Sequence, residues 1–222
     1  MENYGLPDRE RSPSLARFNC PREWVVTVFY PADPEANATP GPYAEEALNT
    51  AYADYSLTKE SAGALDHIHS NAYWNAAANH SAGKFPSCFF SPAAASSPCF
   101  TQPCLSRSAV LVTLWSPFQN RLTPCNPLPD GRILPAIKWQ NGANTKHLAK
   151  AMSGGETAMQ EIMDKMKDNR AKDMIFALSQ LEKINQDNPI LADALDMEKV
   201  GVFGHSFGGA SSVRGCTVRQ TN

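Results

Sequence analysis

The chain shows no excess of charge of either sign and no long hydrophobic run. Among its 222 residues, 20 Lys and Arg residues stand against 22 Asp and Glu residues, which gives a net charge of −2. This balance supplies no electrostatic attraction to nucleic acid or to an anionic membrane, so we expect neither as a partner. No apolar run approaches the roughly 18–20 residues of a membrane-spanning helix, so we expect no transmembrane segment.

The N-terminus lacks the basic and then apolar regions of a signal peptide. Their absence favours a cytoplasmic location, although a different translation start would leave export open. Hydrophobic residues make up 42% of the chain, and the mean hydropathy is −0.37. These values predict a folded chain with a hydrophobic core, and the length suits one domain or part of one.

The six cysteines lack the spacing of a metal site. None forms a C-x-x-C pair, and no His lies near them at zinc-ligand spacing. We therefore predict no metal ion and no cofactor, and we interpret the cysteines as scattered structural thiols. Their even number leaves disulfides as the alternative. The six are Cys20, Cys88, Cys99, Cys104, Cys125 and Cys216.

Hydrophobic patterns predict strands that alternate with helices. Strands separated by helices indicate an α/β protein with a mostly parallel sheet and flanking helices. We expect helices at 43–55 and over 146–187. We expect strands at the apolar runs 24–30, 88–90, 109–115 and 199–203.

The helical region 146–187 is expected to contain two helices, the second beginning near Lys172 and ending before Pro189. In the first of them, four apolar residues recur at helical spacing, and we interpret them as core residues rather than as a binding surface. These four are Met159, Ile162, Met163 and Met166.

The stretch 87–128 lacks residues that a folded surface needs. It has no Gly, Asp, Glu or Lys, yet it holds six Pro, seven Ser and four Cys. Turns usually need glycine, and exposed surface usually carries charge. We therefore hypothesise that this stretch reflects a shifted reading frame, in which Gly codons are read as the alanines 93–95. An unbroken frame in the mature transcript would refute this hypothesis.

One motif carries chemistry: Gly204-His205-Ser206-Phe207-Gly208 matches G-x-S-x-G directly after an expected strand. In such a turn, Gly204 and Gly208 avoid clashes that a Cβ atom would make. Ser206 is held at strained backbone angles that expose its hydroxyl, and the Phe207 amide points toward a developing oxyanion. The motif predicts Ser206 as a nucleophile and Phe207 as a backbone oxyanion donor.

The residues after Ser206 do not complete a catalytic triad. A serine nucleophile needs a His that takes its proton and a carboxylate that orients the His, and in this fold both follow the serine. Positions 207–222 include no Asp, Glu or His. We expect His205 to pack under the turn and favour no other His as the base, so we predict an inactive chain. The histidines are His67, His69, His80, His147 and His205.

Several blocks of the chain resemble, in order, the platelet-activating factor acetylhydrolase family. The resemblance implies an α/β-hydrolase fold that is incomplete at its C-terminal side. It also implies a serine esterase of the 1-alkyl-2-acetylglycerophosphocholine esterase type, which releases short sn-2 acyl groups from phospholipids in lipid catabolism. It carries over Ser206 as nucleophile and Phe207 as oxyanion donor. The blocks are 22–31, 83–86 with 90–92, 129–132 and 199–210.

The polar N-terminal sequence and the resemblance together divide the chain into three parts. We expect a loose lead-in over 1–20, a partial α/β-hydrolase domain over 21–210, and an unrelated or disordered tail over 211–222. The substrate is expected to be a phospholipid or a small ester, and no oligomeric state is predicted. Two other functions stay open: a non-catalytic pseudoenzyme that binds lipid or a partner, and another α/β-hydrolase acting on carboxylic esters or polyesters.

Overall fold

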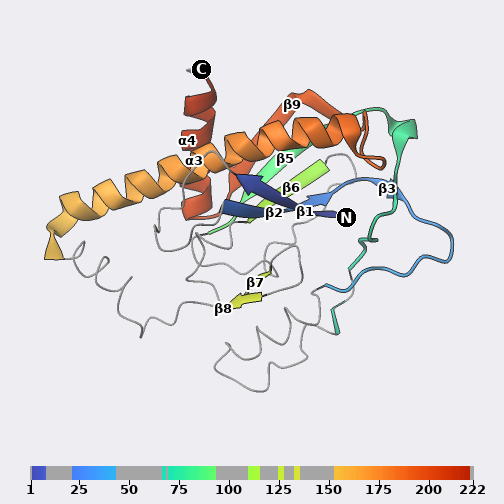
Figure 1. The fold of residues 1–222 in the computed structure, drawn as a ribbon, viewed down its shortest axis with the longest axis horizontal. Coiled ribbons are helices and arrows are strands. Elements are labelled where there is room, and N and C mark those ends of the chain that lie inside the picture. The colour runs from blue at the N-terminus through green and yellow to red at the C-terminus, as the bar shows by residue number, and fades with distance from the viewer. Residues whose placement is uncertain are drawn as a thin grey trace.

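The computed structural model describes residues 2–8, 22–43, 67–68, 70–93, 110–115, 125–127, 133–135 and 153–220. Their centre is a five-stranded sheet with the strand order β1-β2-β6-β5-β9 (Figure 1). The strands are β1 (Glu2–Asp8), β2 (Arg22–Phe29), β5 (Phe85–Ser91), β6 (Val110–Trp115) and β9 (Leu195–Gly204).

The sheet is mostly parallel, as the sequence predicts. Strand β5 pairs in parallel with β6 on one side and with β9 on the other. Strand β2 pairs antiparallel with both β1 and β6. Four of the five strands therefore run in one direction, and β2 runs against them. The expected strands within 24–30, 88–90, 109–115 and 199–203 are confirmed.

The other described elements are short pieces and two helices. The helices are α3 (Gly155–Asp187) and α4 (Phe207–Gln220). Two small antiparallel pairs join β3 (Ala32–Asp33) to β4 (Ala77–Ala78) and β7 (Cys125–Pro127) to β8 (Ile133–Pro135), and η3 covers His80–Ala82. The expected helix at 43–55 lies outside the described residues. None of the described helices is both long and apolar enough to cross a membrane.

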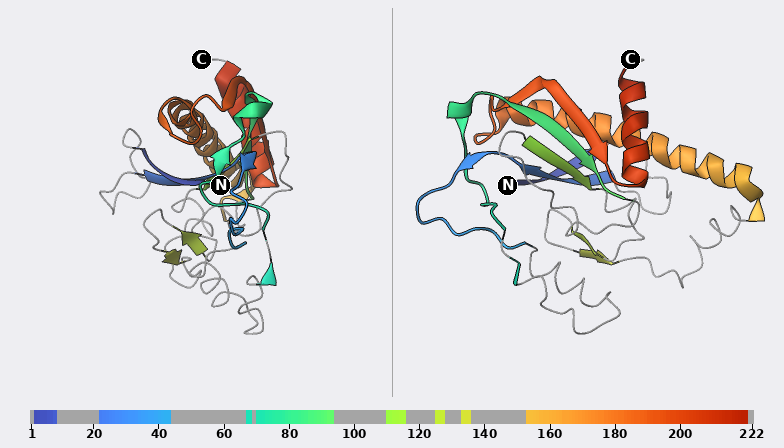
Figure 2. Two further views of the ribbon diagram at one scale, coloured as in Figure 1. Left: turned by 90° about the vertical axis from the view of Figure 1, so that its right-hand side faces the viewer. Right: turned by 180° about the vertical axis from the view of Figure 1, so that it is seen from behind.

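Helix α3 lies across one face of the sheet and encloses the core with it (Figures 1 and 2). Val28 and Val112 from the strands are fully buried, and Leu181 from α3 is 1% exposed. They belong to one apolar cluster that also includes Phe89 and Leu195. Burial of this cluster holds α3 on the sheet, because removing apolar area from water is the main favourable contribution to folding.

Two expectations about the 146–187 region are corrected. Residues 155–187 form one continuous helix rather than two. The buried residues of α3 all lie between Arg170 and Leu181, whereas Met163 and Met166 are 37% and 38% exposed. The reason is visible in Figure 1, where the first half of α3 extends past the sheet and lies over none of the described strands. Met159 and Ile162 are half-buried. None of the four apolar residues is therefore a buried core residue, contrary to their interpretation as core.

The lead-in expected over 1–20 is corrected in part, because residues 2–8 form strand β1. Its pairing with β2 runs from Glu2 opposite Val28 to Asp8 opposite Arg22. Pro7 lies within this strand, where proline is tolerated because β1 is at the edge of the sheet. The edge position therefore explains why a segment rich in turn-forming residues forms a strand.

The tail expected over 211–222 is ordered as far as Gln220, as part of α4. Ser211 and Ser212 are buried, and their hydroxyls donate hydrogen bonds to the carbonyls of Phe207 (2.8 Å) and Gly208 (2.9 Å). These bonds to the preceding turn allow the two serines to be buried within the helix. Whether this segment is unrelated to the family, and whether 87–128 is frame-shifted, both stay predictions.

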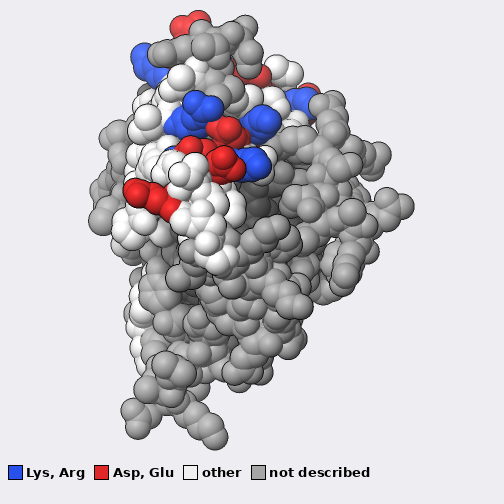
Figure 3. Space-filling model, turned by 90° about the vertical axis from the view of Figure 1, so that its left-hand side faces the viewer, with Lys and Arg blue, Asp and Glu red and all other residues white. Residues whose placement is uncertain are grey.

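Surface charge on the described residues is mixed in sign. Lys167 pairs with Asp164 at 2.5 Å, and Arg214 of α4 pairs with Asp168 of α3 at 2.5 Å. Figure 3 shows acidic and basic side chains lying next to one another on the face it presents. Among the described residues on that face, charges of the two signs therefore lie interleaved rather than gathered by sign.

Candidate active site

The candidate site lies where the parallel strands β5 and β9 end together. Ser91, the last residue of β5, pairs with Gly204, the last residue of β9. The strand order reverses here, because the chain passes from β5 to β6 on one side and later returns to β9 on the other. In open α/β sheets, ligands bind outside the carboxyl ends of strands at such a reversal. Ser206 follows β9 by two residues and is exposed at this place.

The turn that carries Ser206 is strained. Ser206 has a φ of 54°, in the left-handed region that side chains other than glycine rarely adopt. The Gly208 amide donates to the His205 carbonyl at 2.9 Å, and the Ala210 amide donates to the Ser206 carbonyl at 3.2 Å. Helix α4 begins at Phe207. A sharp turn of this kind presents the serine hydroxyl between a strand and a helix N-terminus.

Close backbone approach explains the two glycines of the motif. A Cβ atom on Gly204 would lie 2.5 Å from the Gly208 carbonyl carbon and 2.6 Å from the Ser91 oxygen. A Cβ atom on Gly208 would lie 2.5 Å from the Pro92 oxygen and closer still to the Ser91 oxygen. Since all these atoms belong to the backbone, no side-chain movement would relieve the clash. The turn therefore packs directly on the end of β5.

Phe207 supplies a backbone N–H at the start of α4. The first amides of a helix have no carbonyl acceptor within the helix and carry the positive end of its dipole. The side chain of Phe207 is buried, at 9% exposure, so its backbone is anchored from below. This amide is suited to stabilise negative charge that develops beside Ser206.

Arg170 of α3 reaches this region from beneath, and the sequence reasoning missed it. Its Nη1 donates to the Pro92 carbonyl at 2.6 Å, and its Cζ lies 5.2 Å from the centre of the Phe207 ring. Burial lowers the pKa of Arg170 to about 10, while the Asp173 carboxylate acts in the opposite direction. A signal was present in the sequence: Arg170 occupies the same helical face as Met174, Ala177 and Leu181, where an apolar residue is expected.

No side chain among the described residues is positioned to accept the proton of the Ser206 hydroxyl. None of them forms a hydrogen bond with the Ser206 hydroxyl, and the exposed His205 ring forms none either. His67 and His80 are exposed, and His80 lies in η3, which precedes β5. His69 and His147 lie outside the described residues. Within the same described ranges, no cluster of His, Cys, Asp and Glu is arranged to hold a metal ion.

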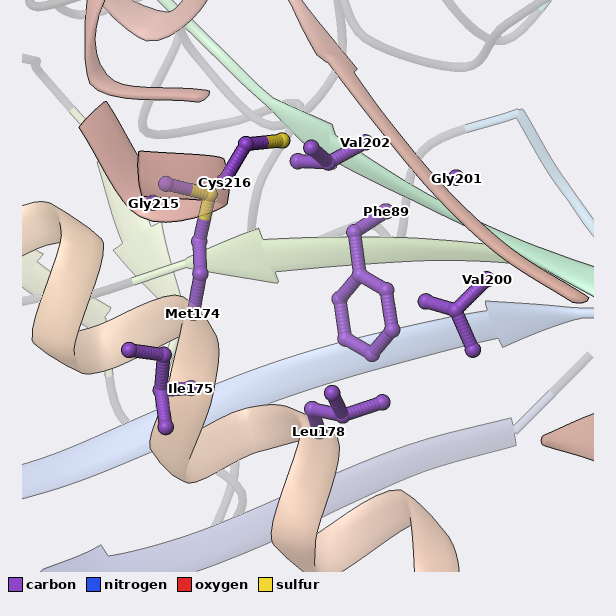
Figure 4. Close-up of a pocket in the computed structure, with 9 residues that line it drawn as sticks. All are labelled: Phe89, Met174, Ile175, Leu178, Val200, Gly201, Val202, Gly215 and Cys216. Carbon is purple, nitrogen blue, oxygen red and sulfur yellow. The ribbon is translucent and has the colours of Figure 1, made fainter. Parts of the chain in front are cut away.

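A separate apolar pocket of about 80 Å³ lies between the sheet and the two helices (Figure 4). Phe89 and Val202 line it from the strands, Met174 from α3, and Gly215 and Cys216 from α4. Its lining includes none of the residues 204–208. The pocket is therefore distinct from the turn that carries Ser206.

Comparison with known protein families finds none that matches the chain, and comparison with curated proteins also finds no match. Among solved structures, the chain is similar to a ferulic acid esterase from Streptomyces cinnamoneus, with a TM-score of 0.68 and 21% sequence identity. The similarity covers 97% of this chain and 54% of that one, so the chain spans about half of that protein's length. At this identity the comparison establishes the fold, and it agrees with an incomplete α/β-hydrolase sheet.

Proposed function

We propose that this chain carries the nucleophile site of a carboxylic ester hydrolase, with Ser206 as the nucleophile. The observation that supports the proposal is the φ of 54° at Ser206, in a turn between β9 and α4 at the reversal of the strand order. Strain of this kind costs about 1–3 kcal/mol and persists where the surrounding structure enforces it. Here the strained conformation is held because Gly204 and Gly208, which have no Cβ, let the turn pack directly against the Ser91 and Pro92 carbonyls.

The chemistry would proceed through an acyl-enzyme. The Ser206 oxygen forms a bond to the ester carbonyl carbon, and the carbonyl oxygen becomes an oxyanion. The Phe207 amide donates to that oxyanion at the helix N-terminus. Collapse of the tetrahedral intermediate breaks the bond from the carbonyl carbon to the alkoxy oxygen, which takes up the proton that Ser206 gave up and leaves as the alcohol. Water then hydrolyses the acyl-serine to the acid and returns a proton to Ser206.

A general base is the component that no described residue supplies. The serine proton must pass to an acceptor as the new bond forms, and loss of that acceptor costs about 10²–10⁴ in rate. We therefore expect the 222-residue chain alone to react with a fluorophosphonate no faster than its Ser206→Ala variant. A base added to the solution is expected to make Ser206 react with the fluorophosphonate, because the strained turn and the Phe207 amide are already in place.

Imidazole tests this proposal directly. The wild-type chain, Ser206→Ala and His205→Ala are incubated with a fluorophosphonate over a range of imidazole concentrations, and the modified peptide is identified by mass spectrometry. We expect imidazole-dependent modification at Ser206 in the wild type and in His205→Ala, and none in Ser206→Ala. Equal modification of the wild type and Ser206→Ala at every imidazole concentration would refute the nucleophile assignment.

For the substrate, we propose short sn-2 acyl esters of phospholipids, with lipid catabolism as the setting. The support is the ordered set of blocks that resemble the platelet-activating factor acetylhydrolase family, including residues 199–210 around the turn. The solved structure of a ferulic acid esterase favours the alternative of a general carboxylic ester hydrolase. The rates of imidazole-assisted turnover of a short-chain sn-2 phospholipid and of a simple aryl ester separate the two alternatives. Faster turnover of the phospholipid supports the phospholipid substrate, and faster turnover of the aryl ester supports the general hydrolase. A cytoplasmic location remains a proposal based on the N-terminal sequence.

One observation favours a second function, that of a pseudoenzyme which binds lipid or a partner. The Ser206 hydroxyl has no hydrogen-bond partner among the described residues, as in a site that has lost its catalytic base. Binding of the chain to phospholipid vesicles, together with no modification of Ser206 by the fluorophosphonate even with imidazole, would support this function over the first.

A further inference from the structure

Arg170 contacts both chain segments that meet at the candidate site. One segment is the end of β5 with Pro92, and the other is the start of α4 with Phe207. We propose that Arg170 is a positioning residue, which sets the oxyanion site by holding the Pro92 carbonyl and the Phe207 ring in a fixed relation. This inference rests on the proposed function, and it assigns a role to a residue that does not touch the substrate.

The contacts of Arg170 are short and shielded from water. Its guanidinium donates to the Pro92 carbonyl at 2.6 Å and lies 5.2 Å from the centre of the Phe207 ring. Arg170 is 7% exposed and Phe207 is 9% exposed. A hydrogen bond from a charged donor and a cation–π contact are both stronger when water is excluded. The guanidinium is a planar group, so one side chain makes the two contacts in a fixed geometry.

The Pro92 contact determines the orientation of a whole peptide unit. A peptide bond is planar and trans, so the Pro92 carbonyl and the Ala93 N–H point in opposite directions within one rigid plane. Holding the carbonyl toward Arg170 therefore turns the Ala93 N–H away from α3. The Pro92 carbonyl also limits Gly208, whose Cβ position lies 2.5 Å from it. Arg170 thus holds in place the Pro92 carbonyl, against which Gly208 of the Ser206 turn is packed.

The Phe207 contact acts on the proposed oxyanion donor itself. The N–H that would bind the oxyanion belongs to the residue whose ring lies under Arg170. If the ring tilts, the first turn of α4 shifts with it, and the N–H moves relative to Ser206. A displacement of about 1 Å at a reacting centre costs on the order of 100-fold in rate.

The alternative is that Arg170 only stabilises the packing of α3 against α4 and has no effect on the Ser206 turn. Arg214 provides the matched comparison, because it joins α4 to Asp168 of α3 at 2.5 Å on the exposed side of the same helices. Arg214 donates to Asp168, and no residue of the Ser206 turn is among its hydrogen-bond partners in the described part of the chain. Arg214→Met removes an Arg-mediated link between the helices and leaves the turn untouched.

The test compares Arg170→Met, Arg170→Lys and Arg214→Met in the full chain with two measurements. The first is the rate of imidazole-assisted fluorophosphonate modification of Ser206 as a function of probe concentration. Arg170→Met is expected to lower the rate at saturating probe by roughly 10- to 100-fold, with the half-saturating probe concentration little changed. Arg170→Lys, which keeps the charge without the planar group, is expected to fall in between, and Arg214→Met to match the wild type.

The second measurement does not depend on reactivity. Amide NMR spectra are expected to show shifts at Ala93 and Phe207 in both Arg170 variants and none there in Arg214→Met. Unshifted amides, or equal shifts in the Arg170 and Arg214 variants, would overturn the inference. If imidazole produces no Ser206 modification in the wild type, the proposed function fails and the amide shifts alone decide the positioning role. If Arg170→Met does not fold, the same two readouts on Arg170→Lys decide it.

Discussion

The Ser91 carbonyl accepts a hydrogen bond from the His205 amide at 3.1 Å, which joins the end of β5 to the turn that carries Ser206. The two residues are far apart in the chain, and they meet because β5 and β9 are parallel neighbours in register at Ser91 and Gly204. The same carbonyl limits the space at Gly204 and Gly208. The strained serine thus depends on the pairing of two strands.

Gly208→Ala is expected to destabilise the chain and to abolish imidazole-assisted modification of Ser206. The added methyl would overlap the Ser91 and Pro92 carbonyl oxygens, which are backbone atoms. We expect the free energy of unfolding to fall by about 3 kcal/mol or more, at or above the usual range for overpacking. Gly201→Ala is the matched control, because its Cβ would meet the Cys88 sulfur at an ordinary 3.6 Å. Equal thermal stability of the two variants would contradict this prediction.

Ser206→Gly is expected to be more stable than Ser206→Ala. Glycine adopts a φ of 54° without the clash that a Cβ makes, so the strain at position 206 is relieved. The expected difference in the free energy of unfolding is about 1 kcal/mol, since a left-handed conformation costs roughly 1–2 kcal/mol per residue with a side chain. Denaturant unfolding of both variants measures it. An alanine variant as stable as the glycine variant would show that the turn is unstrained.

Leu181→Ala and Met163→Ala are expected to differ in their effect on stability. Leu181 is 1% exposed in the core under α3, whereas Met163 is 37% exposed on the part of α3 beyond the sheet. Truncation of Leu181 is expected to lower the free energy of unfolding by about 2–5 kcal/mol. Truncation of Met163 is expected to change it by no more than about 0.5 kcal/mol. A loss of stability in Met163→Ala as large as that in Leu181→Ala would show that Met163 packs as a core residue after all.

Phe203→Lys is expected to reduce aggregation. Phe203 is 45% exposed on β9, the last strand in the order of the described sheet. Lysine on an edge strand opposes pairing with another chain. Loss of the ring contact with Phe90, at 5.1 Å between centroids, is expected to cost about 0.5–1.5 kcal/mol. The fraction remaining in solution after concentration measures the effect. Val213→Lys, at a 70% exposed position of α4, is the control and is expected to leave aggregation unchanged.

Asp196 is expected to titrate below its ordinary value. A hydrogen bond from Lys199, at 3.0 Å, lowers the pKa of the Asp196 carboxyl from 3.8, and the Glu198 amide adds to this effect. The stability that this gives is present above pH 3.8 and is lost as the pH falls through the lower pKa of the folded chain. In Lys199→Met the carboxyl pKa, followed by NMR, is expected to rise toward 3.8. An unchanged titration would show that the pair does not form in solution.

The local sequence pattern was sufficient to predict the main strands, the fold class and the position of Ser206. The apolar runs predicted the strands within 24–30, 88–90, 109–115 and 199–203, and alternation with helices predicted the α/β class. The motif placed Ser206 directly between a strand and a helix, where the structure has it. These features depend on residues close in the chain, whose preferences and spacing are visible without a partner.

Only the tertiary structure decided which segments meet and which faces are covered. Residues 2–8 form a strand because β2 offers them an edge, and Met163 and Met166 are exposed because that part of α3 lies over none of the described strands. Arg170 reaches the Ser206 turn because α3 crosses the sheet at that point. Such contacts join residues far apart in sequence, and their energies depend on burial and neighbours that no local pattern of residues records.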